Sequence, residues 1–283
     1  FGARAFPRRC ARAVCRGLTC PSATQAPVLA MAAKARGAAI AVGGAVAGCC
    51  VTYMGTQLLS APPAARPCPT ERERRETFEK LAPKWDSTVR FDEMVAGIGR
   101  WRSRLVQRAR GDVLEVAVGS GRNFSYYNSA KVKSVTGIDF SRAMLEAADK
   151  KRADLRPIQL RLKLSSSQQM DFEDCSFDTV VDTFGICSFE APVEALREMR
   201  RVVKEDGQVL LLEHGASNWE IIQGMLNRGA QHHADKFGCY PNRNIEKLVR
   251  EAGLHIVCDE RKHFGTTYLL VCSRSAPRLE DDA

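Results

Sequence analysis

The stretch Val113-Leu-Glu-Val-Ala-Val-Gly-Ser-Gly-Arg-Asn123 decides how the rest of the sequence is interpreted. It begins as an apolar run typical of a buried strand and ends in a glycine-rich loop. Gly119 and Gly121 suit a backbone with positive φ and let a ligand approach the main chain closely. Amide groups in such a loop, and at the start of a following helix, bind a ligand's carboxylate. The stretch therefore predicts a ligand site between a strand and a helix.

Strand-like and helix-like segments alternate around this loop. A capping box at Thr70-Glu-Arg-Glu73 indicates the start of one helix, and we expect a second helix around residues 91–108. The expected strands are 113–118, 134–138, 158–164, 177–182, 208–212, 255–259 and 267–272, and the expected helices after the loop are 124–127, 143–151, 193–203, 219–236 and 244–251. The alternation predicts an α/β fold with a parallel sheet covered on both faces, and the final strand pair predicts an antiparallel finish.

Asp139 ends the second expected strand, 18 residues after Gly121. An acid at this place accepts two hydrogen bonds from a ribose diol. The alternative is that Asp139 caps the following helix, although Ser141 is equally suited to that position. A dinucleotide fingerprint would need a third glycine where this chain has Phe124. The loop and the acid together predict a nucleoside cofactor, which could be an adenosine cofactor or a dinucleotide. The missing third glycine counts against NAD, so an NAD-dependent oxidoreductase is the least favoured function.

Three further stretches complete a family resemblance. They are Val135-Thr-Gly-Ile-Asp-Phe-Ser141 with Met144-Leu145, Asp174-Cys-Ser-Phe-Asp-Thr-Val-Val181, and Arg201-Val-Val-Lys-Glu-Asp-Gly-Gln-Val-Leu-Leu-Leu-Glu-His214. Together with residues 113–123, they resemble the class I methyltransferases that use S-adenosylmethionine (SAM), and the resemblance covers about residues 74–275. It implies SAM as the cofactor and a Rossmann-like sheet of seven strands, mostly parallel with an antiparallel last strand.

The resemblance also assigns cofactor-binding positions. It implies that Glu115, Gly119 and Gly121 hold the methionine end, that Asp139 binds the ribose hydroxyls and that Phe140 packs on the adenine. The full expected set is Glu115, Ala117, Gly119, Ser120, Gly121, Asp139, Phe140, Ser166, Ser167 and Thr183.

Two positions depart from the family pattern. Ala117 stands where the family loop has its first glycine, and Ser166-Ser167 stand where relatives have Asp-Ala near the adenine amine. A serine hydrogen-bonds more weakly than a carboxylate does. These departures favour an alternative function, in which the domain keeps the fold but serves as a non-catalytic assembly factor for respiratory-chain or mitoribosome biogenesis.

His214 is the candidate catalytic residue. Methyl transfer from a sulfonium depends mainly on in-line positioning, but a phenol or amine acceptor benefits from a base. His214 follows the fifth expected strand, near the place where a substrate lies in such sheets. The alternative is a histidine that is hydrogen-bonded in a turn. His232 and His233 are neighbours on an expected helix, where they point roughly 100° apart and make a poor metal pair.

A metal site is not expected from the sequence. The chain has 11 cysteines, but they form no CxxC pair and no Cys/His set with the spacing of a zinc site. Most cysteines of the expected domain lie in apolar stretches, so we interpret them as small buried hydrophobic residues.

Charge is concentrated at the N-terminus. Residues 1–70 contain eight Lys or Arg and no acid, whereas the whole chain carries +9, which leaves +1 for residues 71–283. The near-neutral domain therefore gives no indication of a nucleic-acid-binding face. Residues 1–36 have the cationic, acid-free composition of a mitochondrial presequence, with a plastid transit peptide as the alternative.

The next two segments connect this presequence to the domain. Residues 37–61 are uncharged and apolar, which predicts a single transmembrane helix, with an Ala/Gly-rich presequence tail as the alternative. Residues 62–70 are a proline-rich linker, and the methyltransferase domain is expected over residues 71–283.

The segment after the fifth strand narrows the resemblance. Glu213-His-Gly215, residues 230–239 and Ala252-Gly-Leu254 are similar to a group of mitochondrial inner-membrane methyltransferase-like proteins named for suppressing oxidase-assembly defects. That similarity implies methyl transfer to a small-molecule, lipid or quinone-like acceptor at the inner mitochondrial membrane. The ubiquinone/menaquinone methyltransferases are similar at Phe184-Gly185 but have Arg-Asn in place of Ile186-Cys187. The sequence names neither the methyl acceptor nor an oligomeric state.

Overall fold

The computed structural model describes residues 69–276 of the chain. The expected presequence, the expected transmembrane helix and nearly all of the expected linker lie outside these residues. Within residues 69–276, no helix has both the length and the apolar character needed to cross a membrane.

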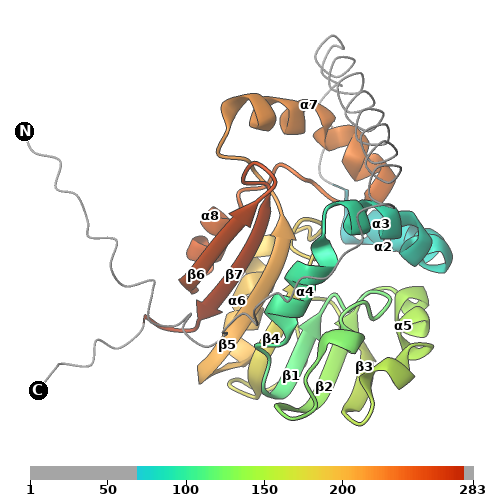
Figure 1. The fold of residues 1–283 in the computed structure, drawn as a ribbon, viewed down its shortest axis with the longest axis vertical. Coiled ribbons are helices and arrows are strands. Elements are labelled where there is room, and N and C mark those ends of the chain that lie inside the picture. The colour runs from blue at the N-terminus through green and yellow to red at the C-terminus, as the bar shows by residue number, and fades with distance from the viewer. Residues whose placement is uncertain (1–68, 277–283) are drawn as a thin grey trace, which may run out of the picture. The chain divides into compact units, whose positions relative to one another are not determined.

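A sheet of seven strands forms the centre of the described domain, in the order β3-β2-β1-β4-β5-β7-β6 (Figure 1). The strands are β1 (Gly111–Val116), β2 (Val132–Asp139), β3 (Gln159–Leu164), β4 (Phe177–Thr183), β5 (Val203–His214), β6 (His255–Lys262) and β7 (Thr267–Ser273). Pairs among β1 to β5 are parallel, and β7 runs antiparallel to both β5 and β6. The expected fold class, with an antiparallel last strand, is confirmed.

Helices connect and cover the strands. They are α2 (Glu71–Leu81), α3 (Trp85–Val95), α4 (Ile98–Val106), α5 (Arg142–Asp149), α6 (Pro192–Val202), α7 (Glu220–Phe237) and α8 (Ile245–Glu251), with short 3-10 turns at Ala82–Lys84, Phe124–Tyr126 and Arg152–Leu155. The single helix expected around residues 91–108 is wrong, because Gly97 adopts a φ of 65° and separates α3 from α4. A left-handed residue cannot continue a right-handed helix.

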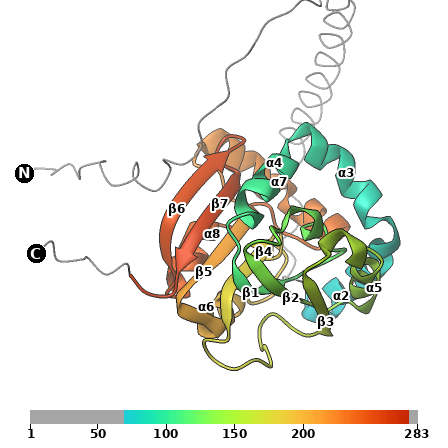
Figure 2. The same ribbon diagram turned by 60° about the horizontal axis from the view of Figure 1, so that its bottom comes forward.

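Each face of the sheet has its own hydrophobic core. Leu114 and Val116 of β1 pack in the cluster that contains the buried residues of α6 and α8. Val113 of the same strand packs in the other cluster, with Leu105 of α4. Side chains of a strand alternate between faces, so the apolar run at residues 113–118 fills both cores. Helix α4 accordingly lies on the opposite face from α6 and α8 (Figure 2).

The strand order reverses at β1, which pairs with β2 on one side and β4 on the other. A crevice opens outside the carboxyl ends of the strands at such a reversal. The loop at residues 117–123, Asp139, Thr183 and His214 all follow or end parallel strands at this edge. Helices α2, α3 and α7 lie beyond the same edge (Figure 1). The topology therefore gathers most of the expected site residues in one place.

The start of α2 provides a test of the described fold. Thr70 Oγ1 accepts a hydrogen bond from the Glu73 amide at 3.3 Å, and Glu73 Oε2 accepts one from the Thr70 amide at 2.8 Å. The expected capping box is thus confirmed. Because Thr70→Ala leaves an amide of the first turn without its partner, we expect it to lower the free energy of unfolding by about 1 kcal/mol in urea titrations of the full chain.

Thr88→Ala serves as the matched control for that prediction. The Thr88 hydroxyl donates only to the Lys84 carbonyl within its own helical segment, at 2.8 Å. Its removal should change the free energy of unfolding by less than about 0.5 kcal/mol. Equal effects of the two substitutions would contradict a capping role for Thr70.

Candidate cofactor and acceptor site

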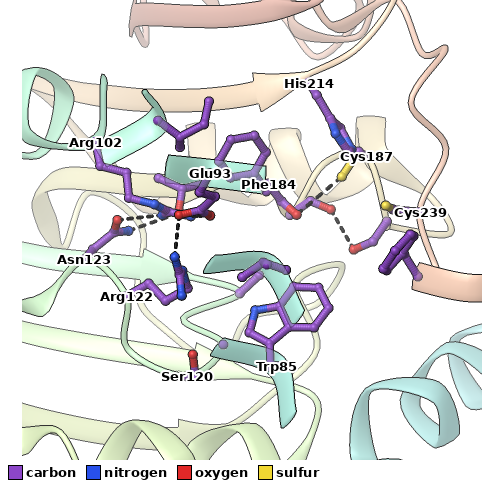
Figure 3. A pocket seen from close by; sticks show the side chains of 18 of the residues that line it. Trp85, Glu93, Arg102, Ser120, Arg122, Asn123, Phe184, Cys187, His214 and Cys239 are labelled. Atoms are coloured by element: carbon purple, nitrogen blue, oxygen red, sulfur yellow. Dashed lines mark hydrogen bonds and ion pairs between the residues drawn. The ribbon is translucent and has the colours of Figure 1, made fainter. Parts of the chain in front are cut away.

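A cavity of about 420 Å³ lies along the carboxyl ends of β1, β2, β4 and β5. This volume is in the range of cavities that bind small ligands. We call one part the glycine-loop end, formed around Gly119, Asp139 and Phe140, and the other the histidine end. The histidine end is lined by Cys187, His214, His233 and Cys239. Figure 3 shows Phe184 between the histidine end and the polar cluster of Arg102, Glu93 and Asn123.

The expected residues that line this cavity are Glu115, Ala117, Gly119, Ser120, Asp139, Phe140, Thr183 and His214. Gly121, Ser166 and Ser167 are not part of its lining. The topology thus brings together eight of the positions that sequence reasoning selected and places three elsewhere.

The two loop glycines have different roles. Gly119 and Gly121 have φ values of 53° and 74°, a region that favours glycine. A Cβ on Gly119 would meet nothing closer than the Ala117 carbonyl oxygen at 3.9 Å, so the space in front of it is open to a ligand. A Cβ on Gly121 would lie 2.6 Å from the Phe124 ring. Gly121 therefore shapes the turn, and Gly119 faces the ligand.

Ala117 occupies the position where the family has a glycine, and its φ is 49°. The left-handed region disfavours residues with a Cβ. The substitution has therefore kept the turn of the loop and has added backbone strain to it.

Asp139 is the central acid of the glycine-loop end. Its side chain is 5% exposed, and its two oxygens accept hydrogen bonds from the amides of Gly119 and Ser141, both at 2.9 Å. Burial raises the pKa of the Asp139 carboxyl to about 6, although the backbone amides oppose this shift. Ser141, and not Asp139, caps α5, because its Oγ accepts from the Met144 amide. The remaining lone pairs of Asp139 fit the two hydroxyl donors of a ribose.

Glu115 is held below the loop by two donors. Asn123 Nδ2 donates to Oε1 at 2.9 Å, and the Tyr127 hydroxyl donates to Oε2 at 2.7 Å. Burial raises the pKa of Glu115 to about 7, and these two hydrogen bonds lower it. Glu115 therefore fastens the loop to the turn that follows, as well as lining the cavity.

Arg102 is a buried cation that sequence reasoning did not select. Its guanidinium donates to Thr183 Oγ1 at 2.8 Å and to Glu93 Oε1 at 2.7 Å, and the side chain is 4% exposed. It also lines the cavity. No local pattern marks Arg102 in the sequence, because its partners come from other segments of the chain. A buried guanidinium at this place is suited to a ligand carboxylate.

Helix α3 covers the glycine-loop end through its acidic residues. Asp86 accepts a hydrogen bond from Ser120 Oγ at 2.6 Å and forms ion pairs with Arg122 and Lys151. No residue of α3 is fully buried. The helix is therefore attached to the loop mainly by charged contacts.

Phe140 and the two serines lie on the outer side of Asp139. The Phe140 ring contacts Phe78 of α2 edge to face, with centroids 5.7 Å apart. Ser166 Oγ donates to Glu71 Oε2 at 2.8 Å, and Ser167 lines a smaller cavity that shares Asp139 and Phe140. The serines are therefore next to the Phe140 side of the site and outside the wall of the main cavity.

A buried pair of acids supports the histidine end. Asp182 and Glu213 are both 0% exposed. Glu213 accepts hydrogen bonds from the amides of Gly185 and Cys187, and Asp182 accepts one from the Ile186 amide. Burial holds the pKa of both carboxyls well above the usual range, and the Glu213 charge raises that of Asp182 further. The pair fixes the turn that follows β4.

His214 ends β5 and lines the cavity, at the edge of the sheet where sequence reasoning expected it. Its ring is edge-on to the rings of Phe184 and His233, with centroid distances of 5.7 Å in both cases. Within residues 69–276, its buried Nε2 atom has no hydrogen-bond partner. The alternative of a histidine satisfied in a turn therefore does not describe Nε2, and a role as base or substrate contact stays a prediction.

Comparison with known proteins gives one family. Residues 114–211 match the family described as "Methyltransferase domain". The chain is 31% identical over 227 residues to the mitochondrial methyltransferase OMS1 of Saccharomyces cerevisiae, covering 75% of this chain and 48% of that protein. This chain therefore spans about half the length of the yeast relative.

The chain covers a larger share of the length of two bacterial relatives. The chain is 32% identical over 170 residues to the ubiquinone/menaquinone biosynthesis C-methyltransferase UbiE of Bdellovibrio bacteriovorus, covering 58% of this chain and 71% of that protein. It is 32% identical over 161 residues to a phosphatidylethanolamine N-methyltransferase of Cereibacter sphaeroides, covering 56% of this chain and 77% of that protein.

A solved structure agrees on the fold. A methyltransferase of Haloferax volcanii, in complex with the activator Trm112, superposes with a TM-score of 0.56 at 16% identity. The superposition covers 70% of this chain and 98% of that one.

The strain at Ala117 gives a prediction about stability. Because glycine adopts a positive φ without steric cost, we expect Ala117→Gly to raise the free energy of unfolding by about 1 kcal/mol. The matched control is Ala147→Gly in the interior of α5, which should lower it by a similar amount. Urea titration of the full chain measures both. A loss of stability in both variants would show that the backbone at Ala117 is not strained.

Proposed function

Because this chain belongs to the class I SAM-dependent methyltransferases, we propose that it transfers the methyl group of SAM to a small, lipid-like or quinone-like acceptor in the mitochondrion. The observation that carries the proposal is the cavity that joins the glycine-loop end to the histidine end. It offers a cofactor and an acceptor adjoining positions in one enclosed space, which is the main requirement of direct methyl transfer.

The residues of the glycine-loop end fit SAM, the cofactor of this family. Asp139 is placed to accept hydrogen bonds from the ribose hydroxyls, and the open space in front of Gly119 admits the methionine end. Arg102 and Arg122 line the same part of the cavity and offer positive charge to the cofactor carboxylate. Bound SAM supplies a methyl group on a sulfonium, which is a good leaving group, so the protein mainly positions the two reactants.

The lining of the histidine end supports an apolar acceptor. Phe184, Phe189 and Phe237 line the cavity together with His214 and His233. Aromatic walls with a few polar groups are typical of sites for apolar small molecules. Two relatives carry names that refer to quinone biosynthesis and to phosphatidylethanolamine, which supports a quinone-like or lipid-like acceptor.

The mitochondrial setting is part of the proposal. The relative from yeast is named as mitochondrial, and residues 1–36 have the acid-free, basic composition of a presequence. We place the protein at the inner membrane, because an apolar acceptor is most concentrated in a lipid bilayer. Residues 37–61 are the proposed attachment.

One of the two sequence departures that favour a non-catalytic function no longer does so in the structure. That function was favoured partly by Ala117 in place of the family glycine, yet Ala117 adopts the left-handed φ that a glycine would adopt. The loop therefore still curves around an open space, and the departure does not close the cofactor site.

The raised pKa of Asp139 predicts how SAM affinity depends on pH. Ribose hydroxyls donate to the ionised carboxylate, so a protonated Asp139 must lose its proton before it can accept both hydrogen bonds. With a pKa of about 6 in the free protein, we expect the SAM dissociation constant to rise as pH falls below 6. The rise approaches roughly tenfold per pH unit. Calorimetric titration between about pH 5 and 8 measures it.

Two variants assign this dependence to a residue. Asp139→Asn should bind SAM weakly at every pH, because it lacks the titrating acceptor. Glu115→Gln is the control, since Glu115 is also buried with a pKa of about 7 but already has two donors. Glu115→Gln should keep the rise below pH 6. A wild-type affinity that is constant across the range would contradict the proposed role of Asp139.

The activity itself is tested with SAM carrying a labelled methyl group. The full chain is incubated with mitochondrial lipid extract, with a short-chain quinol, or with phosphatidylethanolamine vesicles. We expect label in the organic phase with the wild type and at least about 100-fold less with Asp139→Ala, which loses the ribose contact. A cooperatively folded wild type that binds no SAM would refute the enzyme proposal in favour of the assembly factor.

A further inference from the structure

Three side chains with metal-binding atoms converge at the histidine end. The sulfur atoms of Cys187 and Cys239 and a ring nitrogen of His214 all lie within 4.8 Å of one another. Figure 3 shows the three side chains gathered at the side of the cavity beyond Phe184. They come from three separate segments, namely the turn after β4, the end of β5 and the chain just after α7. Local sequence spacing therefore gave no sign of the cluster.

Hydrogen bonds to backbone groups hold these segments against one another. The Tyr240 amide donates to the Cys187 carbonyl at 2.9 Å, which places the chain after α7 beside the turn after β4. Arg243 Nη1 donates to the carbonyls of Ile186 and Phe189 at 2.7 and 2.6 Å. Glu213, the neighbour of His214, accepts from the Cys187 amide. The convergence thus follows from the packing of the backbone.

The donor set has the chemistry of a zinc site. Two thiolates and one imidazole suit Zn²⁺, and three protein ligands with one open position are typical of catalytic zinc. Zn–S bonds of about 2.3 Å put two tetrahedral thiolates roughly 3.8 Å apart, so side-chain shifts of less than about 1 Å would close the cluster. His214 Nε2 is buried and lacks a hydrogen-bond partner within residues 69–276, which leaves it available to an ion.

We propose that Cys187, Cys239 and His214 bind a divalent metal ion of the zinc type, with one coordination position open to the cavity. All three ligands line the cavity, and so does His233, whose Nδ1 lies 3.4 Å from Cys239 Sγ. His233 also approaches the Cys239 carbonyl at 3.0 Å. It is therefore an outer neighbour that orients the Cys239 ligand.

The open position indicates a class of acceptor, and this part rests on the proposed function. An acceptor in the histidine end would coordinate the ion through a sulfur or oxygen atom. Coordination of a thiol or hydroxyl lowers its pKa and orients its lone pair. The site therefore selects acceptors with an S–H or O–H group, such as a thiol or a quinol, over amines that are protonated at neutral pH.

Cobalt titration of the full chain tests the metal site without any use of SAM. The protein is reduced and handled without oxygen, because a disulfide between Cys187 and Cys239 would remove two ligands. Added Co²⁺ should produce a thiolate-to-metal charge-transfer band, together with visible bands typical of tetrahedral coordination. Zn²⁺ should displace the cobalt and abolish both signals.

Variants identify the ligands, since six further cysteines lie outside the described residues. Cys187→Ser and Cys239→Ser should each weaken the affinity of the protein for Co²⁺, as measured by the charge-transfer band. The loss should exceed the roughly 10–100-fold that follows removal of a residue that only orients a ligand. Cys258→Ser, a cysteine of β6 outside the cavity lining, is the control and should bind as the wild type does. His214→Gln is the third ligand variant, and it retains both thiols if a serine variant fails to fold.

Two results would overturn the proposal. One is a reduced, folded wild type without a thiolate-to-cobalt band. The other is a band that survives in Cys187→Ser, Cys239→Ser and His214→Gln alike. Since metal binding is measured in the absence of SAM, either result leaves the methyltransferase proposal to its own test.

Discussion

The hydrogen bond from the Gly119 amide to the buried Asp139 carboxylate is the contact on which the site depends. It joins the loop after β1 to the end of β2, the two neighbours at which the strand order begins to reverse. The loop can approach the carboxylate because Ala117, Gly119 and Gly121 all adopt positive φ values. One acid thereby shapes the loop and still has lone pairs for a ribose. The burial that positions Asp139 also raises its pKa. The packing that shapes the loop therefore also sets the pH range in which the carboxylate can accept hydrogen bonds from a ribose.

Charge and strain gather around this contact, whereas the two cores of the sheet are apolar. Arg102 connects Glu93 of α3 with Thr183 at the end of β4, so a single buried guanidinium links the cover of the cavity to the sheet. Phe184 follows with a φ of 61°, an uncommon conformation for an aromatic residue. It stands between the two ends of the cavity (Figure 3). The sheet is thus held by two apolar cores, and the groups suited to binding chemistry lie along one edge of it.

Features encoded by neighbouring residues could be predicted from the sequence, and features made by distant contacts could not. The strands, the capping box at Thr70, the loop at residues 113–123 and Asp139 all have local patterns, and the structure contains them. The break at Gly97 was missed because a single glycine in a helical pattern often remains helical. Arg102 and the cluster of Cys187, His214 and Cys239 depend on tertiary packing, which no spacing rule detects. Gly121, Ser166 and Ser167 were selected by alignment to the family motifs, but they lie off the cavity wall because the local fold directs them elsewhere.

In the function proposed above, one cavity binds SAM at the glycine-loop end with its methyl group directed toward the histidine end. A crystal structure of the full chain with SAM tests it most directly. We expect the ribose hydroxyls to lie within hydrogen-bond distance of Asp139, the carboxylate near Arg102 or Arg122, and the sulfonium methyl group to face Phe184 and His214. A cofactor bound outside this cavity, or one whose methyl group faces α2 and away from His214, would contradict it.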